Sequence, residues 1–423
     1  MKITIGENKV ICNTNINTIL QYFLIYLLII SHGAKIYSLN EWTFTYMSLI
    51  IGVVYILMNR NKFQNKYIVH MLLIAVLMFV LVFVHSQPYF VTAAIKVIEP
   101  LILLFTAFNI DKEHFFNRVV KAILFFAVIS LGFYLVQIFD ASKLKQYLVQ
   151  VPGWELSDFY GTLFYTYRGV YAGFRNNGIF TEPGLYQMVL NAALMIELYF
   201  PEYLEMPKKH YTISILLLII TILTTGSTTG YMSLGIIIVG FLVKRNTDIL
   251  NRRARRYVIG IIVVVLIFLI INNSMRGTDS ILNIFVFSKF NEMQSFENAS
   301  GNARLSMMNV CGEIIKNNPL ALFLGSGFTA LTNAIVTSGV YATGAFIVSF
   351  ATVAGIPVAI FVYYPYILKP ILKKKNIILG LVFALVWLNT SLAQSRYIYP
   401  FLILLPYLLD GANRKRNAIE VER

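Results

Sequence analysis

Charged residues are scarce in this chain of 423 residues, and that scarcity excludes an ordinary soluble domain. Only 13% of the residues are Asp, Glu, Lys or Arg, and 57% are hydrophobic. Soluble proteins carry about a quarter charged residues. Apolar runs of about 20 residues, long enough to cross a ~30 Å hydrocarbon layer, recur along the chain. Open strands would leave backbone groups unpaired in lipid, so the sequence predicts an all-α, polytopic membrane protein with one membrane-embedded domain over residues 1–423.

Cysteine is equally scarce, and histidine is absent after His210. Cys12 and Cys311 are expected on opposite sides of the membrane, so no disulfide is predicted. No metal-ligand spacing such as CxxC occurs, and the five histidines are scattered along the chain. We therefore expect neither a structural metal nor a cofactor. The long apolar stretch from Ile16 has no small-residue cleavage site after it, which predicts a retained first helix.

Twelve membrane crossings are predicted from the apolar runs. Most of the 35 Lys and Arg residues fall in alternate breaks between these runs, with the densest group at residues 244–256. The positive-inside rule places those breaks and both termini in the cytoplasm. The net charge of +15 follows this pattern, so membrane lipids rather than nucleic acid are the expected partners. The predicted spans are residues 16–36, 40–58, 67–85, 89–108, 119–139, 184–200, 211–226, 228–243, 257–272, 343–364, 377–393 and 397–410.

Two predicted outer loops, at about residues 140–183 and 273–342, are much longer than the other breaks. Long loops between membrane helices are costly to order, so function is expected to concentrate there. The first loop ends in Arg175-Asn-Asn-Gly-Ile-Phe-Thr-Glu182-Pro-Gly, just before an apolar run. Pro183 suits the first turn of a helix, which places Glu182 at its amino end. On the local pattern, Glu182 complements the helix dipole and Arg175 is a solvated loop charge.

The second loop contains Ser300-Gly-Asn-Ala-Arg304 and, later, Pro319. Apolar residues at Leu305, Met308 and Ile315 predict an amphipathic helix that begins near Ser300 and ends before the proline. Arg304 would then lie in the first turn, where the helix dipole disfavours a cation. That position suggests that an anionic ligand meets the arginine.

One predicted span contains two ionisable residues, Lys96 and Glu99. They are three residues apart on one helix face, so an internal ion pair is the favoured interpretation. A polar lining to a substrate cavity is the alternative. Pro100 follows directly and is expected to kink the helix.

Several short motifs resemble those of the O-antigen polymerase family, the Wzy-type proteins related to O-antigen ligases. The first is residues 175–184, and the second is Leu223-Thr-Thr-Gly226-Ser-Thr-Thr-Gly230, which joins two predicted spans. The others are Arg304 with Asn318-Pro-Leu and Gly325-Ser-Gly327, and Ser395-Arg396 before the last span. The plan of about twelve spans with two large outer loops is also similar to that family.

The resemblance implies a glycosyltransferase at the outer face of a bacterial cytoplasmic membrane. Such enzymes join undecaprenyl-pyrophosphate-linked oligosaccharide repeat units into O-antigen, capsule or exopolysaccharide, without a metal or a nucleotide sugar. A departing pyrophosphate calls for bidentate guanidinium groups, and the attacking hydroxyl calls for a base. The catalytic candidates are Arg175, Arg304 and Glu182. Arg396, Asn176, Tyr171 and Tyr186 are the candidates for substrate binding, and a chain-length regulator and a flippase are the implied protein partners.

Two alternatives stay open. A ligase would pass finished glycan to another acceptor, but the related ligases carry an arginine where this chain has Thr228, and a histidine in the large outer loop, where this chain has none. A lipid-linked oligosaccharide flippase would also have about twelve spans, but transporters commonly show internal repeats and intramembrane charges. A ladder of repeat lengths on the lipid carrier would identify a polymerase, and a single transfer to another acceptor would identify a ligase.

The predicted topology can be tested by cysteine labelling in intact cells, or in spheroplasts if an outer membrane blocks access. Cysteines introduced at Gln150 and Ser295 should react with a membrane-impermeant reagent, because both positions are predicted to face outward. A cysteine at Leu250 should not react. Labelling at position 250 would overturn the orientation derived from the basic residues.

Overall fold

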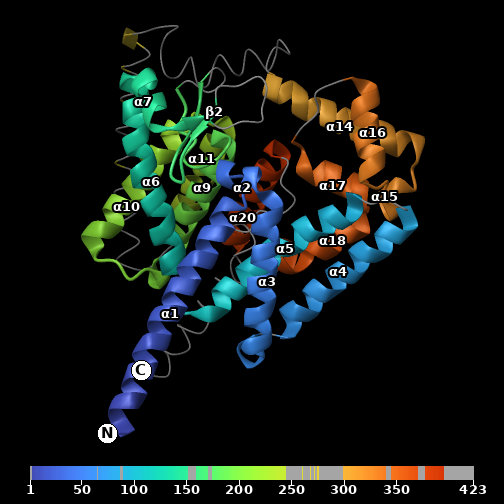
Figure 1. The fold of residues 1–423 in the computed structure, drawn as a ribbon. Coiled ribbons are helices and arrows are strands. Elements are labelled where there is room, and N and C mark those ends of the chain that lie inside the picture. Colours follow the sequence, from blue (N-terminus) through green and yellow to red (C-terminus); the bar gives the residue numbers. More distant parts are fainter. Residues whose placement is uncertain are drawn as a thin grey trace.

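The computed structural model describes residues 2–63, 65–85, 89–150, 159–169, 174–243, 299–339, 344–369 and 377–394, with isolated helical positions between 260 and 275. Most of these residues are helical, as predicted (Figure 1). The predicted spans 257–272 and 397–410 lie almost wholly outside the described residues.

A first group of helices surrounds α5 (Tyr89–Ile110), which contacts α1 (Lys2–Ile30), α3 (Glu41–Met58) and α4 (Asn65–His85). Short helical turns, α2 (Lys35–Leu39) and η1 (Arg60–Lys62), connect members of this group. The predicted first span, residues 16–36, is two elements, because α1 ends at Ile30 and the chain turns at Gly33, whose φ is +109°. Pro100 lies inside α5 without ending it.

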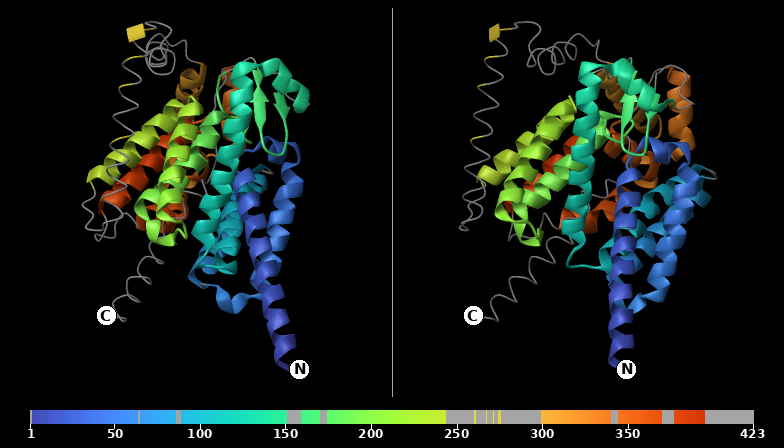
Figure 2. Two further views of the ribbon diagram at one scale, coloured as in Figure 1. Left: turned by 90° about the vertical axis from the view of Figure 1, so that its left-hand side faces the viewer. Right: turned by 60° about the vertical axis from the view of Figure 1, so that its left-hand side comes forward.

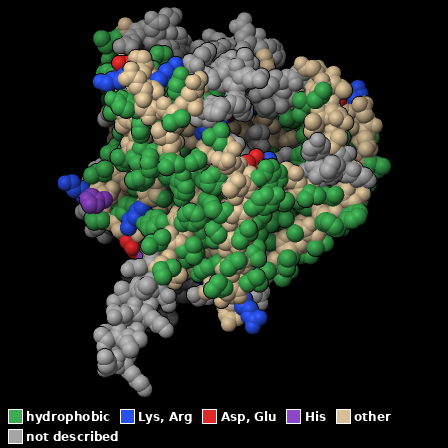
Figure 3. All heavy atoms as spheres, viewed as in Figure 1, with side chains coloured by type: hydrophobic (Ala, Val, Ile, Leu, Met, Phe, Trp, Pro, Cys, Tyr) green, Lys and Arg blue, Asp and Glu red, His purple; other side chains and the backbone are tan. Residues whose placement is uncertain are grey.

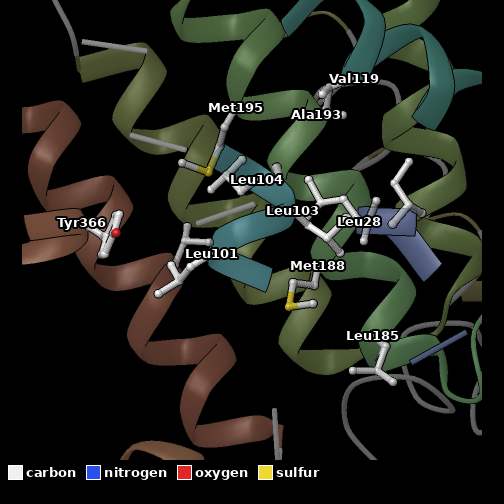
Figure 4. Close-up of a cluster of buried hydrophobic side chains, with 14 of the residues drawn as sticks. Leu28, Leu101, Leu103, Leu104, Val119, Leu185, Met188, Ala193, Met195 and Tyr366 are labelled. Carbon is white, nitrogen blue, oxygen red and sulfur yellow. The ribbon is translucent and has the colours of Figure 1, made fainter. Parts of the chain in front are cut away.

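A second group surrounds α9 (Pro183–Tyr199), which contacts α6 (Phe115–Phe139), α10 (Lys208–Thr224), α11 (Thr228–Val243) and α20 (Ile377–Ala393). Almost every residue in the helix is buried, the polar Gln187, Asn191 and Glu197 included, as expected of a core helix. Figure 4 shows its leucine and methionine side chains among those of α1, α5 and α6. A short turn, η2 (Pro201–Tyr203), follows α9.

Exposed apolar side chains indicate a protein that lies in a membrane. Large hydrophobic residues such as Phe79 and Phe83 of α4 are 59% and 69% exposed, and hydrophobic side chains cover much of the face seen in Figure 3. Soluble monomers rarely expose patches of that kind. Among the described residues, α3, residues 68–85 of α4, and α6 are long and apolar enough to cross a membrane, and there are up to four such spans if one bent pair of helices counts as a single span. The twelve crossings stay a prediction.

The predicted span 343–364 is not one straight helix. It is divided at Gly355 into α17 (Phe346–Ala354) and α18 (Ile356–Tyr363), followed by a π-helical turn, η5 (Tyr364–Leu368), and the two parts are bent by 119°. Gly355 has φ +85° and ψ 149°, a conformation open essentially only to glycine. Pro357 then occupies the first turn of α18, where its missing N–H costs no hydrogen bond.

The bend leaves backbone carbonyl groups without partners within the helix. The Gly-Ser-Gly turn at residues 325–327 donates hydrogen bonds to them. The backbone N–H groups of Ser326 and Gly327 donate to the carbonyl oxygens of Thr352 and Val353, at 2.9 and 3.1 Å. Gly325 fits because a Cβ there would collide with the Val353 carbonyl. In a membrane interior, such irregular backbone is tolerated only where protein groups pair with it. Two short helices, α15 (Ala321–Leu324) and α16 (Phe328–Ser338), flank the turn.

The first long loop contains a short helix and a small sheet, so the all-helical prediction was wrong in this detail. The helix is α7 (Ala141–Tyr147), and the strands are β1 (Val149–Gln150), β2 (Phe159–Gly161) and β3 (Thr166–Arg168). They form an antiparallel sheet in the order β1-β2-β3, with Tyr160 opposite Tyr167 (Figure 2). The hydroxyl oxygen of Thr162 accepts hydrogen bonds from the N–H groups of Phe164 and Tyr165 and closes the hairpin.

The second long loop forms the predicted helix, α14 (Ala299–Asn317), which contacts α16 and α17. The prediction of which residues form its apolar, buried face was only partly right. Leu305 is exposed, and the buried side is formed by Ala303, Met307, Val310 and Cys311. The helix therefore turns its small and sulfur-containing residues toward α17, which a simple count of large apolar residues does not reveal.

Lys96 and Glu99 do not pair with each other, contrary to prediction. The Lys96 ammonium lies 3.1 Å from a carboxylate oxygen of Glu41, at the start of α3. The Glu99 carboxylate is buried and accepts hydrogen bonds from the hydroxyl groups of Tyr37 and Thr45, at 2.8 and 3.0 Å. Neighbouring elements supply these partners, so the three-residue spacing of Lys96 and Glu99 within α5 does not determine how they pair.

We refer to the end of the second group that carries α7 and the sheet as the sheet end. A polar cluster marks the opposite end, where α6 begins. Asp111 pairs with His114 at 2.9 Å and with Arg118 at 3.0 Å. Burial opposes ionisation of Asp111, but the His114 hydrogen bond and the Arg118 charge outweigh it and lower the pKa of the carboxyl group. Arg118 also donates to the Gln21 side chain, which ties α6 to α1.

Gly355→Ala should lower the free energy of unfolding by about 1–3 kcal/mol, because alanine is strained at that backbone conformation. A Cβ at that position would also lie 2.5 Å from the Phe323 carbonyl oxygen. The thermal midpoint of the purified protein in detergent measures the effect.

The control is Gly312→Ala in α14, where a Cβ meets no atom within 4 Å. Alanine should be neutral there, or stabilising by up to about 1 kcal/mol. Equal midpoints for the two variants would contradict the assignment of Gly355 as a required break.

Candidate functional site

The segment from Arg175 to Glu182 lies at the sheet end and is fixed from two sides. On one side, the Thr166 N–H of β3 donates to the Gly178 carbonyl at 2.6 Å. On the other side, Phe180 forms a β-bridge with Ala34, and the Thr181 N–H donates to the Gly33 carbonyl at 3.0 Å. The segment is therefore a defined structure that reaches the start of α9 in one conformation.

Asn176 is buried and holds this segment against two helices. Its side-chain amide donates to Ser130 of α6 at 3.2 Å and to Thr224 of α10 at 3.1 Å. Its side-chain oxygen accepts the Gly178 N–H at 3.0 Å, which forms an Asx turn. Its hydrogen bonds hold the loop against α6 and α10. The predicted role of Asn176 in substrate binding stays a prediction.

Tyr186 is likewise buried, in the first turn of α9. Its hydroxyl lies 2.8 Å from that of Ser130, and its ring stacks on Phe180 with centroids 5.6 Å apart. A Cβ at Gly178 would lie 2.7 Å from the same ring, and Gly178 has φ +53°. Tyr186 thus packs the loop onto α6, and a substrate contact through its side chain stays a prediction.

Glu182 is the residue that caps α9, as the sequence predicted, with Pro183 in the first turn. Its backbone carbonyl accepts the N–H groups of Leu185 and Tyr186, at 3.1 and 3.3 Å. Its side chain is exposed and makes no capping hydrogen bond. The carboxylate therefore stands at the surface of the sheet end and is not used to close the helix.

Arg175 is half-buried at the other end of the segment. Its carbonyl oxygen accepts a hydrogen bond of 3.2 Å from the side chain of Gln137 in α6.

The turn between α10 and α11, which contains Gly226 and Gly230, adjoins the same segment. The Asn176 N–H donates to the Thr224 carbonyl at 3.0 Å, at the last residue of α10. Gly230 packs against Gln187 of α9, where a Cβ would lie 2.8 Å from that side chain. Two of the motifs that carry the family resemblance are therefore in direct contact.

Arg304 approaches from α14. A Cβ at Gly344 would lie 3.0 Å from Cγ of Arg304 and 3.3 Å from the Ala393 carbonyl oxygen. Arg304 is half-buried, and it lies beside the strained start of α17, where Gly344 and Ala345 have φ of +79° and +48°. The end of α20 holds this start in place, since Ala345 and Phe346 donate to the carbonyls of Leu392 and Gln394.

Gln394 connects the two sides of the site, and the sequence analysis missed it. Its backbone anchors α17, and its side-chain amide packs against Gly184 in the first turn of α9, so that a Cβ at Gly184 would collide with Nε2. Residues 393–394 thus lie next to both the Arg304 side and the Glu182 side. The sequence contained a sign that Gln394 belongs to the site, because this polar residue lies between an apolar run and the Ser395-Arg396 motif.

Tyr171 and Arg396 lie outside the described residues. Tyr165, in the same loop as Tyr171, is fully buried, stacks on Phe133 and donates to Gln137 at 2.6 Å. Among the described residues, no group of three or more His, Cys, Asp or Glu side chains is arranged to hold a metal ion.

Comparison with known proteins gives no assignment: no family model, no curated protein and no solved structure matches the chain.

Asn176→Ala should lower the free energy of unfolding by about 1–3 kcal/mol, since it leaves buried hydrogen-bonding partners unsatisfied. A lower thermal midpoint in detergent would verify this. Asn333→Ala, at an exposed position of α16, is the control and should leave the midpoint unchanged. An unchanged midpoint for Asn176→Ala would show that the loop does not depend on this amide.

Proposed function

We propose that the protein is a polysaccharide polymerase that joins lipid-pyrophosphate-linked oligosaccharide repeat units at the outer face of a bacterial cytoplasmic membrane. One observation carries the proposal. The Arg175–Glu182 segment contacts the turn at Gly226–Gly230, and Arg304 lies near residues 393–394, which pack against the first turn of α9. Together they bring two arginines and an exposed carboxylate to one end of the helices around α9.

The chemistry needs those groups. The hydroxyl group of the incoming repeat unit attacks the anomeric carbon of the growing glycan, forming a C–O glycosidic bond. The bond from that carbon to the phosphate oxygen breaks, and undecaprenyl pyrophosphate leaves with the bonding electrons. Glu182 takes the hydroxyl proton. The growing negative charge falls on the leaving group, where preorganised donors have their largest effect.

Arg175 and Arg304 are suited to the leaving group. Guanidinium is planar, keeps its charge, and donates two parallel N–H bonds to a phosphate, which a lysine ammonium cannot do. Arg304 is the sixth residue of α14, so the prediction that it lies in the first turn was wrong, and the helix dipole does not contribute to its role.

Glu182 is suited to the base because its backbone performs the capping while its carboxylate stays exposed. Its position is fixed by α9, whose other residues are almost all buried. A base held on a rigid element keeps its geometry between turnovers.

Glu182→Gln should reduce polymerisation by ~10²- to 10⁴-fold, because glutamine keeps the shape but cannot accept the proton. Glu182→Asp should retain little activity, because the shorter side chain does not reach. The assay incubates the purified protein with a defined lipid-linked repeat unit and resolves the glycan ladder on a gel.

Arg175→Lys and Arg304→Lys should each slow chain growth by at least about tenfold, although the charge is kept. Lys316→Arg is the control, because Lys316 is exposed in the last turn of α14 and should tolerate the change. Intact long chains from all three site variants, Glu182→Gln included, would show that the site assignment is wrong.

A further inference from the structure

A groove lies at the sheet end, where α6 ends and α7 begins. The chain bends at Asp140, between the last residue of α6 and the first residue of α7, and α7 leaves the end of α6 at an angle (Figure 2). The groove between the two helices has a volume of about 440 Å³, within the ~300–1,000 Å³ of typical ligand pockets. Its lining is apolar or aromatic apart from Asp140 and Lys143.

The floor of the groove is packed, whereas its walls are exposed. On the floor, Phe133 stacks on Tyr165 with ring centroids 5.1 Å apart, and Leu144 is buried. On the walls, Phe139 is 85% exposed and Tyr147 is 68% exposed. Exposed apolar area of this kind around a concave surface marks a place where another molecule covers the protein.

The groove lies at the boundary of the membrane. α6 has 25 residues and is long and apolar enough to cross a bilayer. A helix of that length spans about 37 Å, compared with ~30 Å of hydrocarbon, so its last turn reaches the headgroup region. Lipids are therefore the molecules that surround the groove.

The charges at the groove indicate which headgroup fits. Asp140 is used by α7 itself, since one carboxylate oxygen accepts the Lys143 N–H at 2.9 Å and the Ser142 hydroxyl at 2.6 Å. The Lys143 side chain is exposed, and no described residue forms an ion pair with it. A lysine beside a bilayer attracts anionic headgroups. Lys143 is thus the group in the groove that can meet a lipid phosphate.

We propose that the groove between α6 and α7 binds one phospholipid with an anionic headgroup. An acyl chain lies along the apolar lining, and the phosphate lies beside Lys143. This site is separate from the proposed sugar chemistry and does not depend on it.

A lipid in the groove supports the loop that carries the candidate functional site. Leu144 of α7 packs with Tyr165 and Tyr167 in a small hydrophobic cluster. Thr166, between these tyrosines, donates its N–H to the Gly178 carbonyl at 2.6 Å. Successive contacts therefore connect the groove, α7, the sheet and the segment that contains Gly178, and lipid binding is expected to stabilise all of them.

Two phospholipids with identical acyl chains test the headgroup, with binding to the purified full chain in detergent measured by native mass spectrometry. The wild-type protein should bind anionic phosphatidylglycerol more tightly than phosphatidylcholine. Lys143→Gln should weaken phosphatidylglycerol binding about 2- to 5-fold and leave phosphatidylcholine binding unchanged. Asp140→Asn should strengthen phosphatidylglycerol binding, because asparagine keeps the helix cap and removes the negative charge. Lys316→Gln, at an exposed position of α14, is the matched control and should change neither.

A second pair of variants tests the apolar part of the groove. Val136→Trp fills the groove and should weaken binding of both phospholipids. Val128→Trp, at an exposed position of α6 outside the groove, is the control and should bind as the wild type does. Hydrogen exchange gives an independent measurement: phosphatidylglycerol should slow exchange in α7 and β3 of the wild type, but not in Val136→Trp.

Three outcomes contradict the proposal. Equal affinities of the wild type for the two phospholipids, or an unchanged phosphatidylglycerol affinity in Lys143→Gln, would show that the headgroup is not selected. Unchanged binding in Val136→Trp would show that the lipid binds elsewhere. If undecaprenyl pyrophosphate displaces phosphatidylglycerol, and its own affinity falls in Val136→Trp, the groove holds the lipid carrier instead. The polymerase proposal rests on other residues and would survive the first two results.

Discussion

The complete burial of α9 is the constraint on which the rest of the second helix group depends. Almost every residue of the helix is buried, because α6, α10, α11 and α20 cover it at once. Those four neighbours carry the groups that surround its first turn, from Ser130 of α6 to Gln394 after α20. The position of Glu182 is therefore a consequence of core packing, and the loop before it is fitted to a helix that has no freedom to shift.

Backbone hydrogen bonding sets a second condition, most clearly at the break between α17 and α18. A helix that ends inside an apolar environment must have its open carbonyls satisfied by other protein groups. The turn at residues 325–327 provides them, and Gly325 approaches the Val353 carbonyl so closely that a side chain would collide with it. The glycines that carry part of the family resemblance thus have a structural reason. The presence of these glycines therefore does not by itself indicate catalysis.

Sequence reasoning located many of the helices well, because the periodicity of apolar residues and the length of an apolar run are strong local signals. The ends of α3, α11 and α20 agree with the predicted spans within a residue or two. Features that depend on contacts between distant segments could not be read in this way. The small sheet, the bend at Gly355 and the partners of Lys96 all arise from pairing across the fold. For the candidate site, the motifs indicated Glu182, Arg175 and Arg304, but the amide of Gln394 has meaning only once α20 is placed beside α9.

The contact region at residues 344 and 393–394, between Arg304 and the first turn of α9, has a consequence for how such proteins can diversify. Arg304 belongs to α14, which packs on α17, whereas Glu182 precedes α9, and residues 344 and 393–394 lie between them. Under the proposed polymerase function, substitutions at the edge of α9 could change which glycan is recognised, while the Arg304 side, which would meet an invariant lipid pyrophosphate, is left intact.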